Sequence, residues 1–175
     1  MDTSRHWAND IYDVFKRQRI ALVSYVPDAG HVPLLALCQA DPDICLVSLT
    51  TEEEGVAFAA GAYLGGQRSA LLMQSSGVGN CVNMFSLLRT CGFPFLTLVT
   101  MRGEYGEFNP WQVPMGQATP GVLEAMGLVV YRASAPGEVG DVVDAAARLA
   151  FNSYCAVAVL LSQRLIGVKA FTEKK

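Results

Sequence analysis

The sequence alternates six short apolar runs with segments whose apolar residues recur at helical spacing. This alternation constrains the fold more than any other feature. The apolar runs cover residues 20–26, 44–49, 69–74, 94–100, 128–133 and 155–161. Short runs that lack polar alternation are typical of strands buried on both faces. The segments expected to be helical include 4–17, 31–40, 52–64, 80–90 and 136–151. Strand and helix in alternation predict crossover connections, and therefore a three-layer α/β/α fold with a six-stranded parallel sheet.

Composition limits the function classes. The 175 residues are an ordinary length for one domain, so we expect a single domain over 1–175. Hydrophobic residues make up 51% of the chain, which favours a sheet covered on both faces, a partner interface, or both. The formal charge of −3 and the pI near 5.3 offer no basic surface for nucleic acid.

The location of the protein is also constrained. The N-terminus is polar and amphipathic, unlike a signal peptide, and no apolar run approaches the roughly 20 residues of a membrane span. Five scattered cysteines lack metal-ligand spacing, and their apolar contexts favour reduced, buried thiols. We therefore expect a cytoplasmic protein that binds neither nucleic acid nor membranes.

Functional side chains of doubly wound sheets collect in the loops that follow the carboxyl ends of the strands. Those loops are predicted at 26–31, 50–53, 74–80 and 101–118. The last loop is rich in Gly and Pro and is expected to end at Thr119, the N-cap of a helix with Pro120 at its first position. Its Phe108, Trp111 and Met115 fit a functional loop or an interface patch equally well.

Three consecutive glutamates, Glu52 to Glu54, follow the second predicted strand. Acidic residues in the first turn of a helix are stabilised by the helix dipole, which alone could explain them. Successive helical residues lie about 100° apart, so the three carboxylates cannot share one environment. At least one of them is expected to point away from bulk water.

The other polar residues of these loops have ordinary explanations too. The "SSGVGN" segment at 75–80 lacks the third glycine of a dinucleotide fingerprint, so its glycines indicate a tight turn or a close approach to the backbone. Asp28 after Pro27 fits a turn, and His31 fits a helix start, although a histidine at a strand end can titrate near neutral pH.

Taken together, the loop motifs resemble one family. They read "VPD", "TTEEEGVAFAAGAYL", "MQSSGVGNCVN" and "RGEYGEFNPWQVPMGQATPGVLEAMGL". This order resembles the pyrimidine-binding domain of thiamine-diphosphate enzymes, over about residues 8–165. Within that family the chain is most similar to sulfopyruvate decarboxylase α subunits and to the matching part of phosphonopyruvate decarboxylases. The motifs "MQ-S-SG-x-GN-x-x-N" and "PMGQ-x-TP" carry most of this likeness.

The resemblance implies a role for one glutamate. In such enzymes it hydrogen-bonds N1′ of the aminopyrimidine and favours the imino tautomer that removes the thiazolium C2 proton. A carboxyl group partly removed from water can share a proton with a ring nitrogen in this way. The family places a glycine nine residues later, and counting back from Gly61 gives Glu52. Glu53 is the alternative, because "EEGVA" also resembles the Glu-x-Gly version of acetolactate synthases.

The same resemblance implies the rest of the cofactor cradle. Gly77, Val78, Gly79 and Asn80 would lie under the pyrimidine, where missing side chains admit the ring.

The resemblance further implies four residues near the substrate. Gln112 lies where relatives place a histidine or glutamine that faces the substrate, and Asp28 and His31 lie on a loop that overhangs the reacting carbon. Arg102 is available for an anionic head group, because guanidinium pairs bidentately with sulfonate or phosphonate.

No Gly-Asp-Gly motif for diphosphate and Mg²⁺ occurs in the sequence. The resemblance therefore implies a separate β subunit that carries this domain, and a hetero-oligomer that binds thiamine diphosphate with Mg²⁺ on the partner. The expected reaction is decarboxylation of 3-sulfopyruvate to sulfoacetaldehyde and CO₂. Phosphonopyruvate or another small anionic 2-oxoacid is the alternative substrate. A non-catalytic binding or regulatory domain is the third reading.

Overall fold

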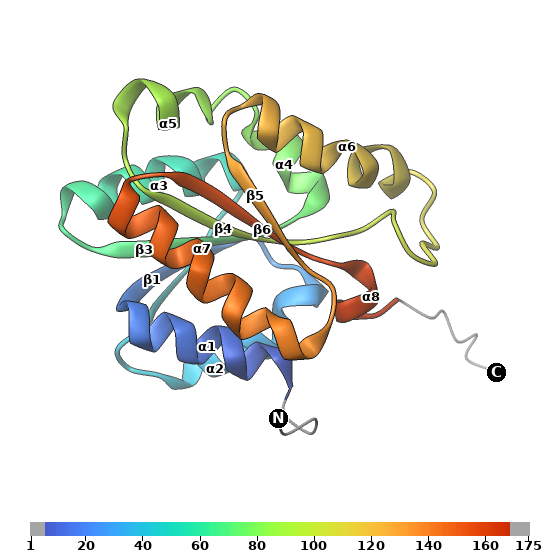
Figure 1. The fold of residues 1–175 in the computed structure, drawn as a ribbon, viewed down its shortest axis with the longest axis horizontal. Helices are drawn as coiled ribbons and strands as arrows, with labels where there is room; N and C mark the ends of the chain where they lie inside the picture. The colour runs from blue at the N-terminus through green and yellow to red at the C-terminus, as the bar shows by residue number, and fades with distance from the viewer. Residues whose placement is uncertain (1–5, 169–175) are drawn as a thin grey trace.

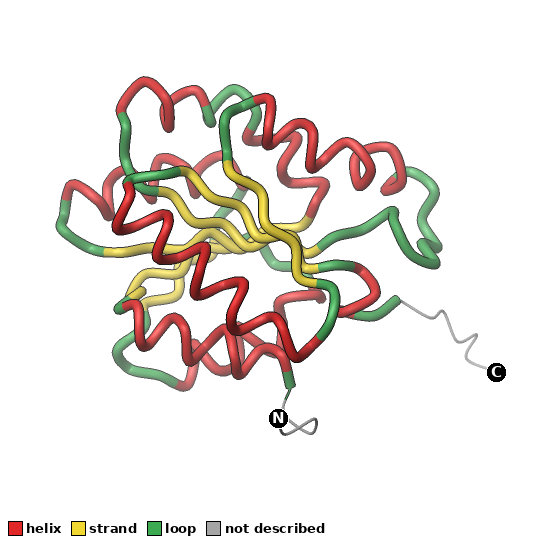
Figure 2. The backbone as a smooth tube through the Cα atoms, viewed as in Figure 1, coloured by secondary structure: helices red, strands yellow, loops and turns green. Residues whose placement is uncertain are grey.

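Six parallel strands form one sheet in the computed structural model of this protein, which describes residues 6–168 (Figures 1 and 2). The strands are β1 (Ile20–Tyr25), β2 (Cys45–Ser48), β3 (Arg68–Gln74), β4 (Phe95–Thr100), β5 (Val129–Ala133) and β6 (Ala156–Leu161). Their order across the sheet is β2-β1-β3-β4-β6-β5, and each pair of neighbours is parallel. All six match the apolar runs within one residue at either end. The predicted fold class is confirmed.

Helices cover both faces of the sheet, as Figure 1 shows. One face carries α1 (Trp7–Gln18), α2 (Val32–Ala40) and α7 (Val139–Ser153). The other carries α3 (Glu52–Leu64), α4 (Ser75–Cys81), α5 (Ser86–Cys91) and α6 (Gln112–Ala125). Three short helical turns complete the order: η1 (Ala29–His31), η2 (Pro136–Glu138) and α8 (Gln163–Ile166).

The direction in which the chain crosses the sheet explains which face each helix covers. From β1 to β2 and from β5 to β6 the chain moves toward one side of the sheet, through α2 and α7. The other three crossings move the opposite way, through α3 to α6. Because parallel crossover connections are almost always right-handed, the two directions place their helices on opposite faces of the sheet. The direction changes between β1 and β3. Their carboxyl ends therefore form the crevice in which such sheets bind ligands.

Each face of the sheet has its own hydrophobic core. On the α1 face, Trp7, Ile11, Val14 and Phe15 are buried, which confirms their predicted helical stripe. Residues 4 and 5 of the predicted helix lie outside the described residues. The opposite core includes Val56, Val78, Leu88 and Leu123, one from each of α3 to α6. Burying one aliphatic or Phe side chain stabilises the folded state by about 1.5–3 kcal/mol. This packing therefore stabilises helices whose intrinsic helix propensity is poor.

The prediction of a loop at 74–80 is wrong, because Ser75–Cys81 forms helix α4. The predicted helix over 80–90 is correspondingly divided, and α5 begins only at Ser86. Two glycines disfavour α4 by about 1 kcal/mol each. The helix nevertheless buries Val78 and Cys81 completely in the core, and this tertiary packing outweighs the local preference.

The predicted loop at 101–118 ends earlier than expected, because α6 begins at Gln112. Thr119 and Pro120 are therefore inside a helix and are not its N-cap and first residue. The buried Thr119 hydroxyl donates to the Met115 carbonyl at 2.7 Å. Pro120 lacks an N–H and would normally break a helix. The helix is held here by packing of Thr119 and Leu123, which no local pattern reveals.

Other expectations concern the surface and the thiols. All five cysteines are free. Cys38 and Cys81 are buried as expected, but the expectation is wrong for the exposed Cys45 and Cys91 and for the half-buried Cys155. Among residues 6–168, no helix is both long and apolar enough to cross a bilayer. In the same range, no group of three or more His, Cys, Asp or Glu side chains is placed to hold a metal ion.

Candidate active site

Glu52 is the first residue of α3, directly after the turn that follows β2, and it differs from its two neighbours in exposure. Its side chain lies in a buried environment, with 8% of the residue exposed, whereas Glu53 and Glu54 are exposed. Glu54 accepts a hydrogen bond from the Thr50 N–H at 2.9 Å, as a helix-start carboxylate does. The helix-start explanation therefore holds for Glu54 and leaves Glu52 unexplained.

The Glu52 carboxylate packs on the start of α4, which follows β3. Asn80 Nδ2 donates to Oε2 of Glu52 at 2.8 Å. A Cβ at Gly77 would overlap the carboxylate, so the missing side chain at this position is a condition for the contact. Within the described residues, Oε1 accepts no hydrogen bond. The arrangement is a fixed, largely dry carboxylate with one oxygen left for a ligand.

The remaining residues of the predicted cradle divide between surface and core. Gly79 and Asn80 are exposed beside Glu52, whereas the Val78 side chain is fully buried in the core. Val78 can therefore offer a ligand no more than its backbone. A Cβ at Gly79 would lie 3.5 Å from Met115 Sδ, so α4 and α6 are also closely packed here.

Asp28 follows β1 and bridges the crevice between β1 and β3. Its carboxylate accepts from Gln74 Nε2 at 2.8 Å, from Thr100 Oγ1 at 2.6 Å and from the Gly30 N–H at 3.2 Å. Three neutral donors hold the charge in place without cancelling it. The sequence assigned no role to either donor: Gln74 lies in the "MQ-S-SG-x-GN-x-x-N" motif, and Thr100 ends a strand outside the quoted motifs.

His31 lies behind Asp28 and has no exposed surface. Its Nε2 is 3.3 Å from the Met73 carbonyl, and its Nδ1 has no partner among the described residues. Burial lowers the pKa of the imidazole, which favours its neutral form. The structure does not bring the predicted His31 to the open part of the site.

Arg102 follows β4 and forms a nearly buried ion pair with Glu107. Its Nε donates to Glu107 Oε2 at 2.7 Å and its Nη2 donates to Oε1. The guanidinium is the largest cause that lowers the Glu107 pKa; together with the backbone amides of Asn109 and Gly103, and against burial, it brings that pKa to about 2. The same pair, opposed by burial, raises the pKa of Arg102. Two of its nitrogens are therefore already committed within the chain.

Glu107 also fastens the loop that leads to Gln112. Gln163 Nε2, after β6, donates to Glu107 at 2.8 Å. The Gln163 side-chain oxygen accepts from the N–H groups of Glu104 and Tyr105 at 3.1 and 3.0 Å. These contacts fix the loop against α8 and place the partly buried Gln112 at the start of α6. Glu107 lies within the quoted loop motif but was given no role there, and its contact with Gln163 was not foreseen because the two are 56 residues apart.

A cavity of about 140 Å³ lies between these groups. Its lining includes Asp28, Gly30 and Arg102, and residues 166–168 complete it. Predicted residues thus meet in two clusters at the carboxyl edge of the sheet: Glu52, Gly77 and Asn80 form one, and Asp28 and Arg102 the other. This edge lies on the right in Figure 1.

Comparison with solved structures shows the fold. A doubly wound sheet whose buried glutamate packs on Gly77 is the arrangement that the resemblance to a pyrimidine-binding domain implies. No protein-family model matches the chain. The fold is similar to that of 2-oxoglutarate:ferredoxin oxidoreductase from Magnetococcus marinus, with a TM-score of 0.73 and 14% identity. That match covers 93% of this chain and 29% of the other.

Comparison of the sequence is more specific. The chain is 36% identical to sulfopyruvate decarboxylase subunit alpha of Methanococcus maripaludis, over 86% of this chain and 91% of that one. It is 37% identical to the same subunit of Methanothermobacter thermautotrophicus, over 86% and 92%. Phosphonopyruvate decarboxylase of Streptomyces viridochromogenes is 36% identical, over 60% of this chain and 27% of its own. The chain belongs to the family of sulfopyruvate decarboxylase α subunits, and the resemblance inferred from its motifs is confirmed.

Proposed function

We propose that this chain is the α subunit of a thiamine-diphosphate-dependent decarboxylase that converts 3-sulfopyruvate to sulfoacetaldehyde and CO₂. The single observation that carries the proposal is the Glu52 carboxylate, buried on Gly77, whose Oε1 accepts no hydrogen bond from residues 6–168. Family membership supports the reaction class, and matches over about nine-tenths of the α subunits support sulfopyruvate as the substrate.

The residues present fit the pyrimidine end of the cofactor. A flat ring can approach the exposed Gly79 closely, because no Cβ stands in the way. Glu52 would hold a proton at a ring nitrogen, and its hydrogen bond from Asn80 fixes the carboxylate's orientation. When bound, thiamine diphosphate supplies the electron-accepting ring that lets a 2-oxoacid lose CO₂.

The second cluster would contact the substrate. In this proposal Gln112 and Asp28 face the reacting groups, and the neutral, buried His31 supports the Asp28 loop from behind. Arg102 would reach the sulfonate with Nη1, which makes no hydrogen bond within residues 6–168. Because Asp28 and Glu107 both lie near Arg102, this chain offers little net positive charge to a dianion.

The proposal therefore needs a partner. A β subunit would supply the diphosphate and Mg²⁺ site and further positive charge, as the name "subunit alpha" of the relatives supports. Two exposed aromatics of the loop, Phe108 and Trp111 with 58% and 70% of their surface exposed, are available to that interface. A reduced, cytoplasmic enzyme is consistent with the five free thiols.

Paired substitutions in the assembled α/β enzyme test the proposal. Glu52→Gln should lower kcat for sulfopyruvate by about 100-fold or more, because it removes the proton-sharing group. Glu53→Gln, the matched control on the adjacent exposed residue, should leave kcat within about twofold of the wild type. Full activity of Glu52→Gln would reject the proposal and favour a non-catalytic binding domain.

Phosphonopyruvate is the second candidate substrate, favoured by the 36% identity to the Streptomyces enzyme. Comparing kcat/KM of the α/β enzyme for sulfopyruvate and phosphonopyruvate separates the two. No turnover of sulfopyruvate with turnover of phosphonopyruvate would change the substrate and keep the role of Glu52.

A further inference from the structure

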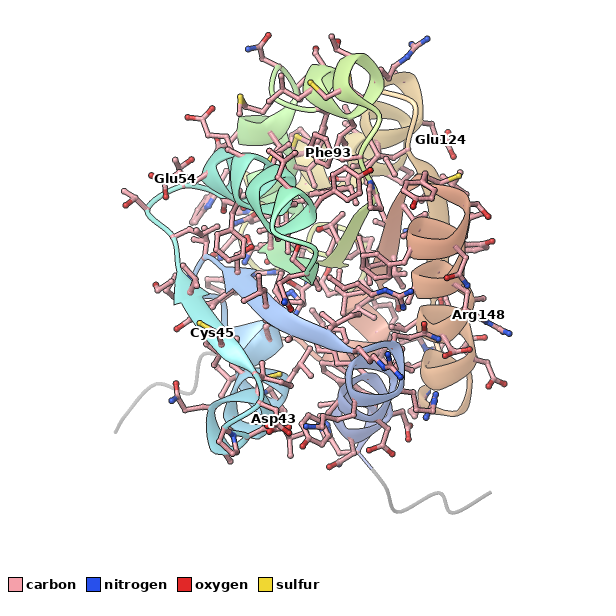
Figure 3. The ribbon with its side chains drawn as sticks, turned by 90° about the vertical axis from the view of Figure 1, so that its left-hand side faces the viewer. Asp43, Cys45, Glu54, Phe93, Glu124 and Arg148 are labelled. Atoms are coloured by element: carbon pink, nitrogen blue, oxygen red, sulfur yellow. The ribbon has the colours of Figure 1, made fainter. Side chains whose placement is uncertain are left out.

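The edge of the sheet opposite Glu52 carries a depression lined by arginines. Figure 3 looks onto this edge, where Asp43 and Phe93 precede β2 and β4. The depression has a volume of about 490 Å³ and is lined by Arg17, Arg19, Gly66, Gln67 and Arg68. Three of the nine arginines of an acidic chain thus meet in one place, and no carboxylate from the described part of the chain lines it.

The charges of these arginines are only partly compensated. Arg68 donates to the carbonyl and side-chain oxygens of Gln18 at 2.9 and 3.3 Å, and both acceptors are neutral. Arg17 lies 3.8 Å from Asp144, a carboxylate that also pairs with Arg148 at 3.0 Å. Among the described residues Arg19 has no side-chain partner. The guanidinium of Arg68 is thus fixed, and that of Arg19 remains available.

The surrounding charged groups reduce this positive excess without removing it. Lys16, on the same helix, is paired with Asp41 at 2.7 Å and Asp43 at 3.0 Å. This one lysine offsets one of the two negative charges, and Asp43 also lines a depression together with Arg19. Of the arginines at 17, 19 and 68, only Arg17 has a carboxylate within ion-pair distance among residues 6–168, that of Asp144.

An aromatic depression of about 230 Å³ adjoins the basic one and shares Gly66, Gln67 and Arg68 with it. Its other lining residues are Tyr63, Pro94, Phe151 and Tyr154. The rings of Tyr63 and Tyr154 meet edge to face, 6.2 Å apart, and both residues are more than a third exposed. Arg68 lies over the Phe151 ring at 5.0 Å, so one side chain joins the two depressions.

We propose that these adjoining depressions bind a nucleoside phosphate, with the base against the tyrosines and the phosphate against the arginines. Guanidinium groups match phosphate oxygens bidentately, and aromatic side chains stack on any base because each has a π-face. A site that binds only an anion needs the basic depression alone. The adjoining aromatic depression adds a surface for the base.

The site is separate from the proposed active site. Arg19 and Arg68 stand at the amino ends of β1 and β3, and Tyr154 precedes β6. Asp28 follows the carboxyl end of β1, and α4 with its glycines follows the carboxyl end of β3. The proposal does not depend on the proposed reaction, and it can be tested on the full chain alone.

Calorimetric titration of the full chain with AMP, adenosine and inorganic phosphate tests the proposal. AMP should bind saturably and at least about tenfold more tightly than either fragment, because both halves contribute. Arg19→Gln, which removes one charge from an exposed residue, should weaken AMP about tenfold. Tyr63→Leu should weaken AMP and leave phosphate unchanged.

Two control variants test whether AMP binds at these depressions and not elsewhere on the chain. Arg89→Gln, an exposed arginine on α5, and Glu52→Gln, at the opposite edge, should both bind AMP like the wild type. Absence of saturable AMP binding, or wild-type affinity in Arg19→Gln, overturns the proposal. Equal affinities for AMP and phosphate overturn it as well. The proposal is also overturned if the wild-type chain is a dimer and Tyr63→Leu is a monomer, because the aromatic depression is then a dimer interface.

Discussion

Glu52, Glu53 and Glu54 are adjacent and chemically identical, yet the fold gives them different environments. Glu52 is turned under α4 and bonded by Asn80, while Glu54 serves the backbone of its own turn. The reason is rotation about the helix axis, because successive residues point about 100° apart. A carboxylate in so restricted a place depends on the size of its neighbours.

Gly77 is the neighbour that can be tested most directly. In Gly77→Ala the new Cβ would occupy the position of the Glu52 carboxylate and displace it. We expect kcat of the α/β enzyme to fall at least about tenfold, and stability by about 1–3 kcal/mol from overpacking. Gly61→Ala in α3 is the matched control, since no atom lies within 4 Å of its Cβ. It should keep full activity, and equal activity of both variants would contradict the contact.

Glu107 makes a prediction about pH. Its pKa is about 2 in the folded protein against an ordinary value of 4.5, so its pairing stabilises the protein fully above pH 4.5. This stabilisation is lost as the pH falls from 4.5 toward 2. Glu107→Gln should therefore be about 3 kcal/mol less stable at neutral pH, and the deficit should shrink below pH 4.5. Urea unfolding of both proteins between pH 7 and 3 measures it. A deficit that is independent of pH, or also seen in Glu124→Gln, would refute the role of the ion pair.

At the scale of elements, the segment from β4 to α6 is where the structure differs most from the sequence-based expectation. Its glycines and prolines are typical of a loop, yet its charged side chains and backbone amides hydrogen-bond to Gln163 of α8. Gly116 allows this close approach, since a Cβ there would overlap the Arg102 carbonyl. The loop therefore delivers Gln112 to a defined position.

We expect the Gln163 side chain to hold this loop in its folded position. Gln163→Ala removes the acceptor of the Glu104 and Tyr105 amides, so these two amides should exchange hydrogen faster, by about tenfold or more. Hydrogen exchange followed by NMR, with the exposed Gln117→Ala as control, measures the effect. Unchanged exchange at Glu104 and Tyr105 would show that the loop is held by other contacts.

At the scale of the whole molecule, the sheet has two cores and one edge that collects the proposed catalytic groups. The exposed Trp111 lies on the loop at that edge, whereas Trp7 is buried in the α1 core. The chain thus provides a natural reporter for the partner that the proposed function requires.

Association with the β subunit should bury Trp111. Trp111→Ala should weaken α/β association by about tenfold or more, as loss of an interface aromatic does. Leu64→Ala, 85% exposed at the opposite edge, should not affect it. Titration followed by sedimentation gives both affinities. Equal affinity of Trp111→Ala and the wild type would place the interface elsewhere.

The sequence by itself determined the six strands, the parallel sheet and the family. Apolar runs buried on both faces leave few alternatives, and the loop motifs are specific. It could not decide which glutamate is buried, that residues 75–81 and 112–118 are helical, or that Glu107 and Gln163 hold the loop. Those outcomes depend on contacts between residues far apart in the chain. Packing against α3, α6 and α8 there outweighs the local preferences of glycine and proline, and only the tertiary structure brings such partners together.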